Sequence, residues 1–311
     1  MERGLPLWAA FAIVRHPIFV KKPRIGKKPM KLVRYGAAGH EKPGLVDASG
    51  TIRDLSSHIA DINSATISPD SLAKLKALDP STLPAVPAGV RLGSCVARPG
   101  NFIAVGLNYA DHAAESNMPV PEQPILFNKA PNCVQGPDDV IVIPKGSEKT
   151  DWEVELAIVI GKTALYVDEK NALDYVAGFC VCNDISERAF QTERGGQWMK
   201  GKGSPTFGPI GPWLVTKDEI KDVQNLDMFL EVNGKRVQNG STKTMIFGVA
   251  HLVAYISQFM QLDAGDVITT GTPPGVGMGM KPPVYLKAGD TMKVGIAGLG
   301  EQNQKVEAYK A

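Results

Sequence analysis

Two acidic side chains stand two positions apart in the apolar segment at residues 151–161, which reads DWEVELAIVIG. Alternate residues of a strand point to the same face, so Glu153 and Glu155 would share one face while Trp152 and Val154 share the other. Two carboxylates about 7 Å apart on such a strand repel each other unless a cation lies between them. The segment therefore has two interpretations: oxygen ligands for a hard divalent cation, or a solvated edge strand with outward glutamates.

A third carboxylate is available at Asp184, where the strand-like segment VAGFCVCND ends. It lies in a polar run with Ser186, Glu187 and Arg188. An aspartate at a strand end is also a common turn or cap residue, so this position is a candidate ligand and no more on its own.

His112 and Glu115 could form a base and its orienting partner. Residues three apart on a helix share a face, so the carboxylate can hold the imidazole for activation of a water molecule. In isolation, a surface pair at this spacing is the more common arrangement. His251 lies near the apolar stripe of a predicted long helix, which favours a structural role.

Several familiar motifs are absent. Residues 196–202 resemble a phosphate loop, but Gly203 follows where Ser or Thr is required. The run at residues 275–279 lacks the third glycine in the register that a dinucleotide site requires, and no G-x-S-x-G elbow occurs. The four cysteines contain no CxxC pair, which argues against zinc and predicts free thiols in a reducing cytoplasm.

Length and composition indicate a globular chain of one large or two smaller domains. It has 311 residues, 43% hydrophobic and 21% charged. No apolar run approaches the ~18 residues of a membrane span. Residues 1–29 hold seven bases and one acid, which leaves 27 bases and 31 acids in the remainder. This mildly acidic body argues against binding to nucleic acid.

The pattern along the chain divides it into three parts. Residues 1–29, with an apolar run at 5–14 and a basic, proline-containing stretch, are interpreted as a disordered or non-native extension. Residues 30–92 form a small α+β domain that ends in a proline-rich linker at 79–89. Residues 93–311 form the main domain.

The elements expected to position the candidate residues are mostly strands. Alternation and turn residues predict strands at 31–35, 44–46, 51–55, 103–105, 125–127, 140–143, 152–160, 176–183, 226–232, 236–238, 267–270, 291–296 and 305–309. Asn233-Gly234 predicts a two-residue hairpin. Helices are predicted at 69–78 with Ser68 as the N-cap, at 109–116, and at 244–260 with Ser241 or Thr242 as the cap. Without regular βα alternation, the chain is predicted to be a mainly β (α+β) roll.

Nine segments taken together resemble the fumarylacetoacetate hydrolase family. They lie at 106–115, 124–137, 151–162, 176–191, 197–216, 232–238, 245–257, 265–277 and 286–290, and they agree in order. The resemblance implies a mixed β-sandwich roll with a small N-terminal α+β domain, and a homodimer. It also implies a metal at Glu153, Glu155 and Asp184, which is Mg²⁺ or sometimes Mn²⁺ or Ca²⁺.

The same resemblance implies roles for the other site residues. Lys202 matches the lysine near the metal, and His112 with Glu115 matches the water-activating pair on a mobile lid. Arg188, Gln191 and Thr272 match positions that contact substrate oxygens, and Tyr109 is grouped with them. Leu107 stands where many members have Arg, and Pro205 where many have Asp. Residues 117–122 and 275–280 are expected to select the substrate.

The activity that the resemblance implies is hydrolysis of a carbon–carbon bond in a 2,4-dioxo acid, with release of pyruvate or a related 2-oxo acid. The substrate would be an acylpyruvate or a 2,4-diketo-3-deoxy sugar acid. One alternative is a lyase that uses the same site, either an oxaloacetate decarboxylase or a ureidoglycolate lyase. Another is a catalytically silent metal-binding protein, but His112, Glu115 and Lys202 are all present.

Overall fold

The computed structural model describes Met1, residues 30–115 and residues 118–311. The predicted extension at residues 1–29 lies outside the described residues except for Met1, so its interpretation stays a prediction. The end of the predicted helix 109–116 and the start of segment 117–122 also lie outside them. In the described part of the chain, no helix has both the length and the apolar composition that crossing a membrane requires.

Strands dominate the architecture, which confirms the predicted mainly β class. Within the described residues the larger sheet has ten strands in the order β3-β2-β1-β12-β10-β9-β15-β4-β5, and β6 pairs with β12. These strands are β1 (Lys31–Tyr35), β2 (Lys42–Val46), β3 (Ile52–Asp54), β4 (Phe102–Gly106), β5 (Ile125–Lys129), β6 (Val134–Gln135), β9 (Val154–Ile160), β10 (Val176–Asn183), β12 (Gly208–Thr216) and β15 (Val267–Thr269).

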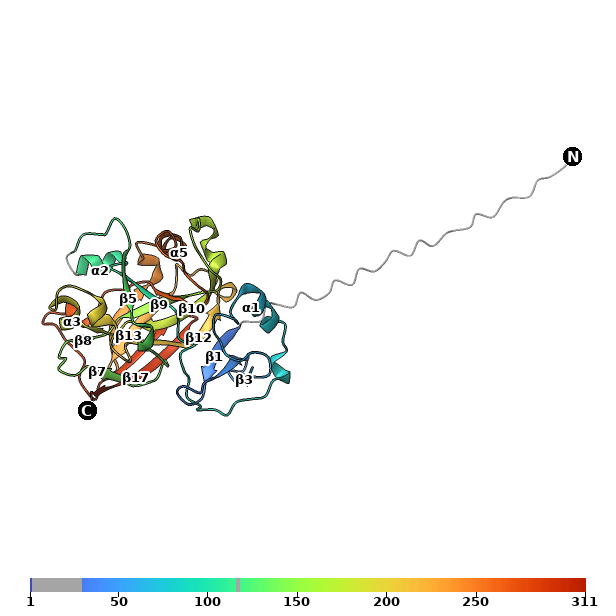
Figure 1. Ribbon diagram of the computed structural model, residues 1–311, viewed down its shortest axis with the longest axis horizontal. Coiled ribbons are helices and arrows are strands. Elements are labelled where there is room, and N and C mark those ends of the chain that lie inside the picture. Colours follow the sequence, from blue (N-terminus) through green and yellow to red (C-terminus); the bar gives the residue numbers. More distant parts are fainter. Residues whose placement is uncertain (2–29, 116–117) are drawn as a thin grey trace.

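A second sheet packs against the first. Its order is β14-β13-β16-β17-β7, formed by β13 (Asp227–Val232), β14 (Lys235–Ser241), β16 (Thr291–Ile296), β17 (Gly300–Ala308) and β7 (Ile141–Ile143). Strands β9, β10 and β12 contact β13, β16 and β17, so the main apolar core lies between the sheets (Figure 1). A short ribbon, β8 (Thr150–Asp151) with β11 (Ser186–Glu187), lies beside them.

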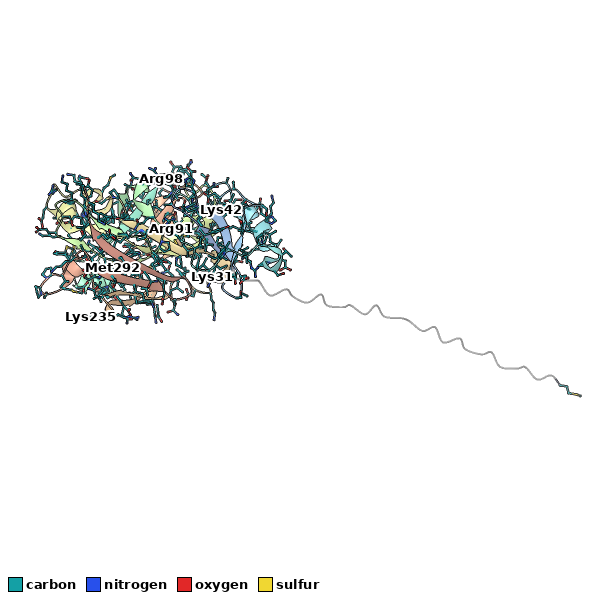
Figure 2. All side chains as sticks on the ribbon, turned by 90° about the horizontal axis from the view of Figure 1, so that it is seen from below. Lys31, Lys42, Arg91, Arg98, Lys235 and Met292 are labelled. Atoms are coloured by element: carbon teal, nitrogen blue, oxygen red, sulfur yellow. The ribbon has the colours of Figure 1, made fainter. Side chains whose placement is uncertain are left out.

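The N-terminal strands continue the larger sheet. β1 pairs antiparallel with β12, with Lys31 opposite Val215 and Leu32 opposite Leu214. In Figure 2, Lys31 and Lys42 lie at the end of the molecule formed by these strands, away from Met292 and Lys235 of the second sheet. The predicted division near residue 92 stays a prediction, but the sheet itself runs across it.

Short helices cover the sheets. They are α1 (Pro69–Lys76), α2 (Ala110–Glu115), α3 (Arg188–Thr192), α4 (Met199–Lys202) and α5 (Val249–Ile256), with 3₁₀ turns η1 (Pro80–Thr82), η2 (Pro131–Cys133), η3 (Glu169–Tyr175), η4 (Lys217–Glu219), η5 (Thr242–Thr244) and η6 (Gly277–Gly279). The predicted cap of α1 is confirmed, because the backbone N–H of Ser71 donates to Ser68 Oγ at 3.2 Å.

The predicted helix at 244–260 is wrong at both ends, since α5 has only eight residues and Gly248 is its N-cap. The backbone N–H groups of Ile246 and Phe247 donate to Asn108 instead of to helical carbonyls. At the other end, Phe259 is 63% exposed and lies beyond the helix. The apolar periodicity is real, but contacts with a distant loop decide where the helix begins.

The hairpin at Asn233-Gly234 is confirmed, and both residues have the positive φ angles that such a turn requires (53° and 76°). In contrast, β12 was not predicted, because the glycines and prolines in its sequence GPIGPWLVT are typical of turns. Its pairing with β10 shifts register near Gly211, which has a φ of 132°. A bulge of this kind accommodates glycine and proline inside a sheet.

Candidate functional site

Three carboxylates converge where β9 and β10 run side by side. Glu155 lies opposite Cys182 in the ladder, and the backbone N–H of Asp184 donates to the carbonyl of Glu153 at 2.9 Å. Carboxylate oxygens of Glu153, Glu155 and Asp184 lie within 4.8 Å of one another, and all three residues are buried. The convergence predicted for these residues is therefore present.

β9 is an interior strand of the larger sheet, bounded by β10 and β15. The alternative interpretation, an edge strand with glutamates in solvent, is thereby excluded. The strand begins at Val154 and not at Trp152, because residues 152–153 link it to β8. Glu153 consequently lies directly before the first residue of β9, and Glu155 is the second residue of the strand.

Two cations bind Glu153. Lys202 Nζ lies 2.7 Å from Glu153 Oε2 and 2.8 Å from Asp184 Oδ2. Arg188 Nη2 lies 2.5 Å from Glu153 Oε1. Burial raises the pKa of Glu153, but Arg188 and Lys202 outweigh that effect and lower it to about 2. Glu153 is thus ionised at neutral pH.

Two further residues complete the cluster, and sequence reasoning assigned neither of them a role. Lys129, at the end of β5, is fully buried and places Nζ 2.5 Å from Asp184 Oδ1. Asp151 accepts from Arg188 Nε at 2.9 Å and from the backbone N–H of Gly277 at 2.7 Å. The available signal was that Lys129 ends the strand-like segment ILFNK and that Asp151 begins the segment that carries Glu153 and Glu155.

Within the described residues the cluster contains four carboxylates and three cations, and Glu155 is the one carboxylate that forms no ion pair with them. Its Oε2 accepts a hydrogen bond from the backbone N–H of Gly271, at 2.8 Å. Burial, together with the nearby charges of Asp184 and Glu153, raises the pKa of Glu155 well above its usual range. An additional cation beside Glu155 would remove this electrostatic cost.

The donor set fits a hard divalent ion. A carboxylate offers about four lone-pair sites, so Glu153 and Asp184 can bind a metal while keeping the ion pairs described above. Three carboxylate oxygens from a rigid sheet, with room for further ligands in a cavity, suit Mg²⁺, Mn²⁺ or Ca²⁺.

The predicted pair on α2 faces the same cavity. His112 Nδ1 lies 3.0 Å from Glu115 Oε2, and His112 is buried. Glu115 also accepts from the backbone N–H of Gly275 at 3.0 Å, which anchors the carboxylate. If Nδ1 carries the hydrogen and donates a hydrogen bond to Glu115, Nε2 is the unprotonated, basic nitrogen of the ring.

Three of the four residues predicted to contact substrate lie in the wall of the cavity. Arg188, Gln191 and Thr272 line the cavity, and Gln191 Oε1 accepts from Arg188 Nη1 at 3.0 Å. Thr272 Oγ1 donates to the carbonyl of Val154 and accepts from Gln238 Nε2, so its hydroxyl is already engaged.

Tyr109 is the exception. It is fully buried, its hydroxyl donates to Met228 Sδ at 3.2 Å, and it is not part of the cavity wall. The prediction that Tyr109 contacts substrate is corrected on this geometry, because the ring packs into the core behind the site. Burial also raises the pKa of Tyr109 well above its usual range.

The cavity has a volume of about 700 Å³. Glu153, Glu155, Arg188, Lys202 and the His112–Glu115 pair line one part of it. Six large apolar side chains line another part of it, namely Leu107, Met118, Phe127, Trp198, Met278 and Met280. A concave site with a few convergent polar groups and an apolar wall is typical of small-molecule binding.

Comparisons with known proteins identify relatives of the whole chain. The family described as Fumarylacetoacetate (FAA) hydrolase C-terminal matches residues 101–307. A Burkholderia multivorans protein, named only provisionally as a hydrolase, is 63% identical over 282 residues that cover 90% of this chain and 100% of the relative.

Two solved structures extend the comparison. A fumarylacetoacetate hydrolase from Exiguobacterium antarcticum is 37% identical with a TM-score of 0.79, and the match covers 90% of this chain and 100% of the other. Maleylpyruvate hydrolase from Sphingobium sp. SYK-6, in complex with manganese (II) ion and pyruvate, is 28% identical with a TM-score of 0.76 and the same coverage.

Proposed function

The chain belongs to the fumarylacetoacetate hydrolase family, and on that premise we propose that it is a divalent-metal-dependent hydrolase of 2,4-dioxo acids. The bond cleaved lies between C3 and C4 of an acylpyruvate or a 2,4-diketo-3-deoxy sugar acid. The products are pyruvate, or a related 2-oxo acid, and the carboxylic acid derived from the acyl part.

One observation carries this proposal: Glu153, Glu155 and the His112–Glu115 pair line a single cavity, and the carboxylate of buried Asp184 lies within 4.8 Å of the two glutamates. The manganese and pyruvate in the Sphingobium hydrolase structure support the same pairing of metal and 2-oxo acid. The names of the relatives do not specify one substrate for this chain.

Glu153, Glu155 and Asp184 would hold the metal, with Mg²⁺ the first candidate and Mn²⁺ or Ca²⁺ the others. When bound, the ion supplies chelation of the carboxylate and 2-oxo oxygens of the substrate and stabilises negative charge on the departing pyruvate unit. Lys129, Lys202 and Arg188 hold the carboxylates of Glu153 and Asp184 in place.

His112 is the proposed general base. Its Nε2 takes a proton from water, whose oxygen forms a bond to C4 of the substrate. As this bond forms, the π electrons of the C4 carbonyl move to its oxygen. When the carbonyl re-forms, the C3–C4 bond breaks, its electron pair goes to C3, and the proton held on His112 Nε2 is returned to C3 to complete the pyruvate unit. Glu115 holds the imidazole and stabilises its protonated form.

Lys202 is proposed to stabilise the negative charge that develops on the 2-oxo oxygen as the enolate forms. Its Nζ already lies between Glu153 and Asp184, at the cavity surface. A preorganised donor of this kind contributes roughly 3–4 kcal/mol to the transition state.

The His112–Glu115 geometry favours hydrolysis over decarboxylation of oxaloacetate on the same site, because decarboxylation needs no attacking water. A small panel of 2-oxo acids, assayed for pyruvate release with Mg²⁺ and with a chelator, tests the proposal. Acylpyruvates or diketo-deoxy sugar acids should release pyruvate only with metal. Turnover of oxaloacetate with neither of those substrates cleaved would refute hydrolysis.

A further inference from the structure

We infer that the acyl part of the substrate is uncharged and largely apolar, so that the substrate class is an aliphatic or aryl acylpyruvate. This inference rests on the proposed function, because it concerns the part of the cavity that would receive the group beyond C4. It excludes acyl groups that end in a carboxylate.

The apolar wall is formed by the six side chains named above, and none of them is buried in the protein. Met118 is 48% exposed and Met278 is 41% exposed. Large apolar side chains left open around one cavity mark a surface that a ligand covers. Methionines at two edges of the wall can adjust to ligands of different shape.

The wall begins directly beside the carboxylate cluster. The rings of Phe127 and Trp198 meet edge to face with centroids 5.3 Å apart, and Lys202 Nζ lies 5.2 Å from the Phe127 centroid. A group attached to a 2-oxo acid held at the carboxylates would therefore meet these two rings first.

The Trp198 ring packs directly against Gly106, the last residue of β4. A Cβ atom at Gly106 would lie 2.4 Å from the Trp198 ring, so only a residue without a side chain lets the indole pack there. The backbone of the sheet thus forms a rigid support behind the aromatic part of the wall.

Leu107 is held in the wall at a conformational cost. Its φ is 51°, in the left-handed region that non-glycine residues seldom adopt. Asn108 fixes the next turn, because its Nδ2 donates to the carbonyls of Thr270 at 2.8 Å and Phe247 at 3.0 Å. Backbone strain of this kind is typical of ligand-binding positions.

A carboxylate at the end of the acyl group would find little compensation here. Arg188 and Lys202 are engaged by Asp151, Glu153 and Asp184. Among the described residues that line the cavity, the other lysine or arginine is Lys281, which is exposed. Placing a charge against the apolar wall would cost desolvation without a buried partner.

Binding of 2-oxo acids that lack a 4-oxo group tests the inference without requiring turnover. Titration calorimetry with Mg²⁺ would compare 2-oxoglutarate with 5-methyl-2-oxohexanoate, in which an isopropyl group replaces the terminal carboxylate. A 2-oxo-3-deoxyhexonate supplies a hydroxylated tail. We expect the isopropyl compound to bind at least about tenfold more tightly than either of the others.

Variants locate the effect. Leu107→Arg should tighten 2-oxoglutarate binding by about tenfold, whereas Leu107→Gln, similar in size but uncharged, should not. Trp198→Leu should weaken the isopropyl compound by about tenfold. Lys281→Met should leave 2-oxoglutarate binding unchanged. Phe259→Ala, an exposed aromatic outside the cavity, is the matched control and should alter none of these values.

The outcomes separate the two proposals. Equal or tighter binding of 2-oxoglutarate or the hydroxylated acid overturns the apolar assignment and leaves hydrolysis standing. Loss of 2-oxoglutarate binding in Lys281→Met also overturns the apolar assignment, because it would show that Lys281 binds the terminal carboxylate. If none of the three acids binds with Mg²⁺, chelation of a 2-oxo acid fails and the proposed function fails with it.

Discussion

Lys129 and Asp184 form an ion pair of 2.5 Å between residues that are 55 positions apart, and both side chains are completely buried. Lys129 Nζ also donates to the carbonyl of Lys202 at 2.7 Å, so one ammonium group connects β5, the end of β10 and helix α4. Burial lowers the pKa of Lys129, but Asp184 and neighbouring groups more than compensate and raise it. The pair thus joins the scaffold to the candidate metal site.

Lys129→Met should destabilise the protein by about 3–5 kcal/mol, because it leaves Asp184 as a buried charge without this partner. Urea denaturation checks the change. Lys149→Met removes an exposed pair with Glu193 and should leave the midpoint unchanged. Similar midpoints for the two variants would contradict the role given to Lys129.

Glu155→Gln should raise the melting temperature of the metal-free protein while weakening metal binding, because it removes the carboxylate that lacks a cation. In the wild type, Mg²⁺ at 100 times its Kd should stabilise the fold by about 2.7 kcal/mol, and a chelator should reverse this. Thermal shift with and without Mg²⁺ measures both effects.

The control for Glu155→Gln is Glu301→Gln, an exposed glutamate paired with Lys293. It should retain the full Mg²⁺ response. An undiminished Mg²⁺ response in Glu155→Gln would refute the assignment of the metal ligands.

His112→Ala should lower kcat roughly 100- to 10,000-fold while metal binding persists, because the general base is lost and the carboxylates remain. Glu115→Gln should act in the same direction through the imidazole that it orients. Steady-state kinetics and Mg²⁺ titration separate the two properties.

His251→Ala provides a matched comparison, since His251 Nδ1 also lies 3.0 Å from a glutamate, Glu169, but outside the cavity. Its kcat should equal that of the wild type. Equal losses in the two histidine variants would indicate a structural effect and not base catalysis.

Asp151→Asn should raise KM by about tenfold with a smaller change in kcat, because Asp151 positions other groups and does not line the cavity. Its carboxylate holds Arg188 and the backbone N–H groups of Gly277 and Met278. A fall in kcat alone would place Asp151 in the chemistry instead.

A chain that starts at Met30 should show unchanged activity and melting temperature. Met30 is buried, and its carbonyl accepts from the backbone N–H of Thr216, so this residue already belongs to the folded part of the chain. Comparison of the two chains by kinetics and calorimetry tests this, and a lower melting temperature would show that residues 1–29 contribute to the fold.

Features that depend on neighbours along the chain could be predicted from the sequence. The alternation around Glu153 and Glu155, the i,i+3 spacing of His112 and Glu115, and the Asn233-Gly234 hairpin are of this kind. In each, strand or helix periodicity, or turn geometry, alone decides which side chains can meet.

Features that depend on pairing between distant segments could not be predicted in this way. The pairing of β10 with β9 makes Asp184 a third carboxylate of the cluster, and the position of β5 makes Lys129 its partner. Contacts to Asn108 shorten α5, and packing turns Tyr109 away from the cavity. The sequence by itself thus determined the local periodicities and candidate groups, whereas tertiary structure decided which charges meet, because a buried carboxylate takes its partner from whatever the fold places beside it.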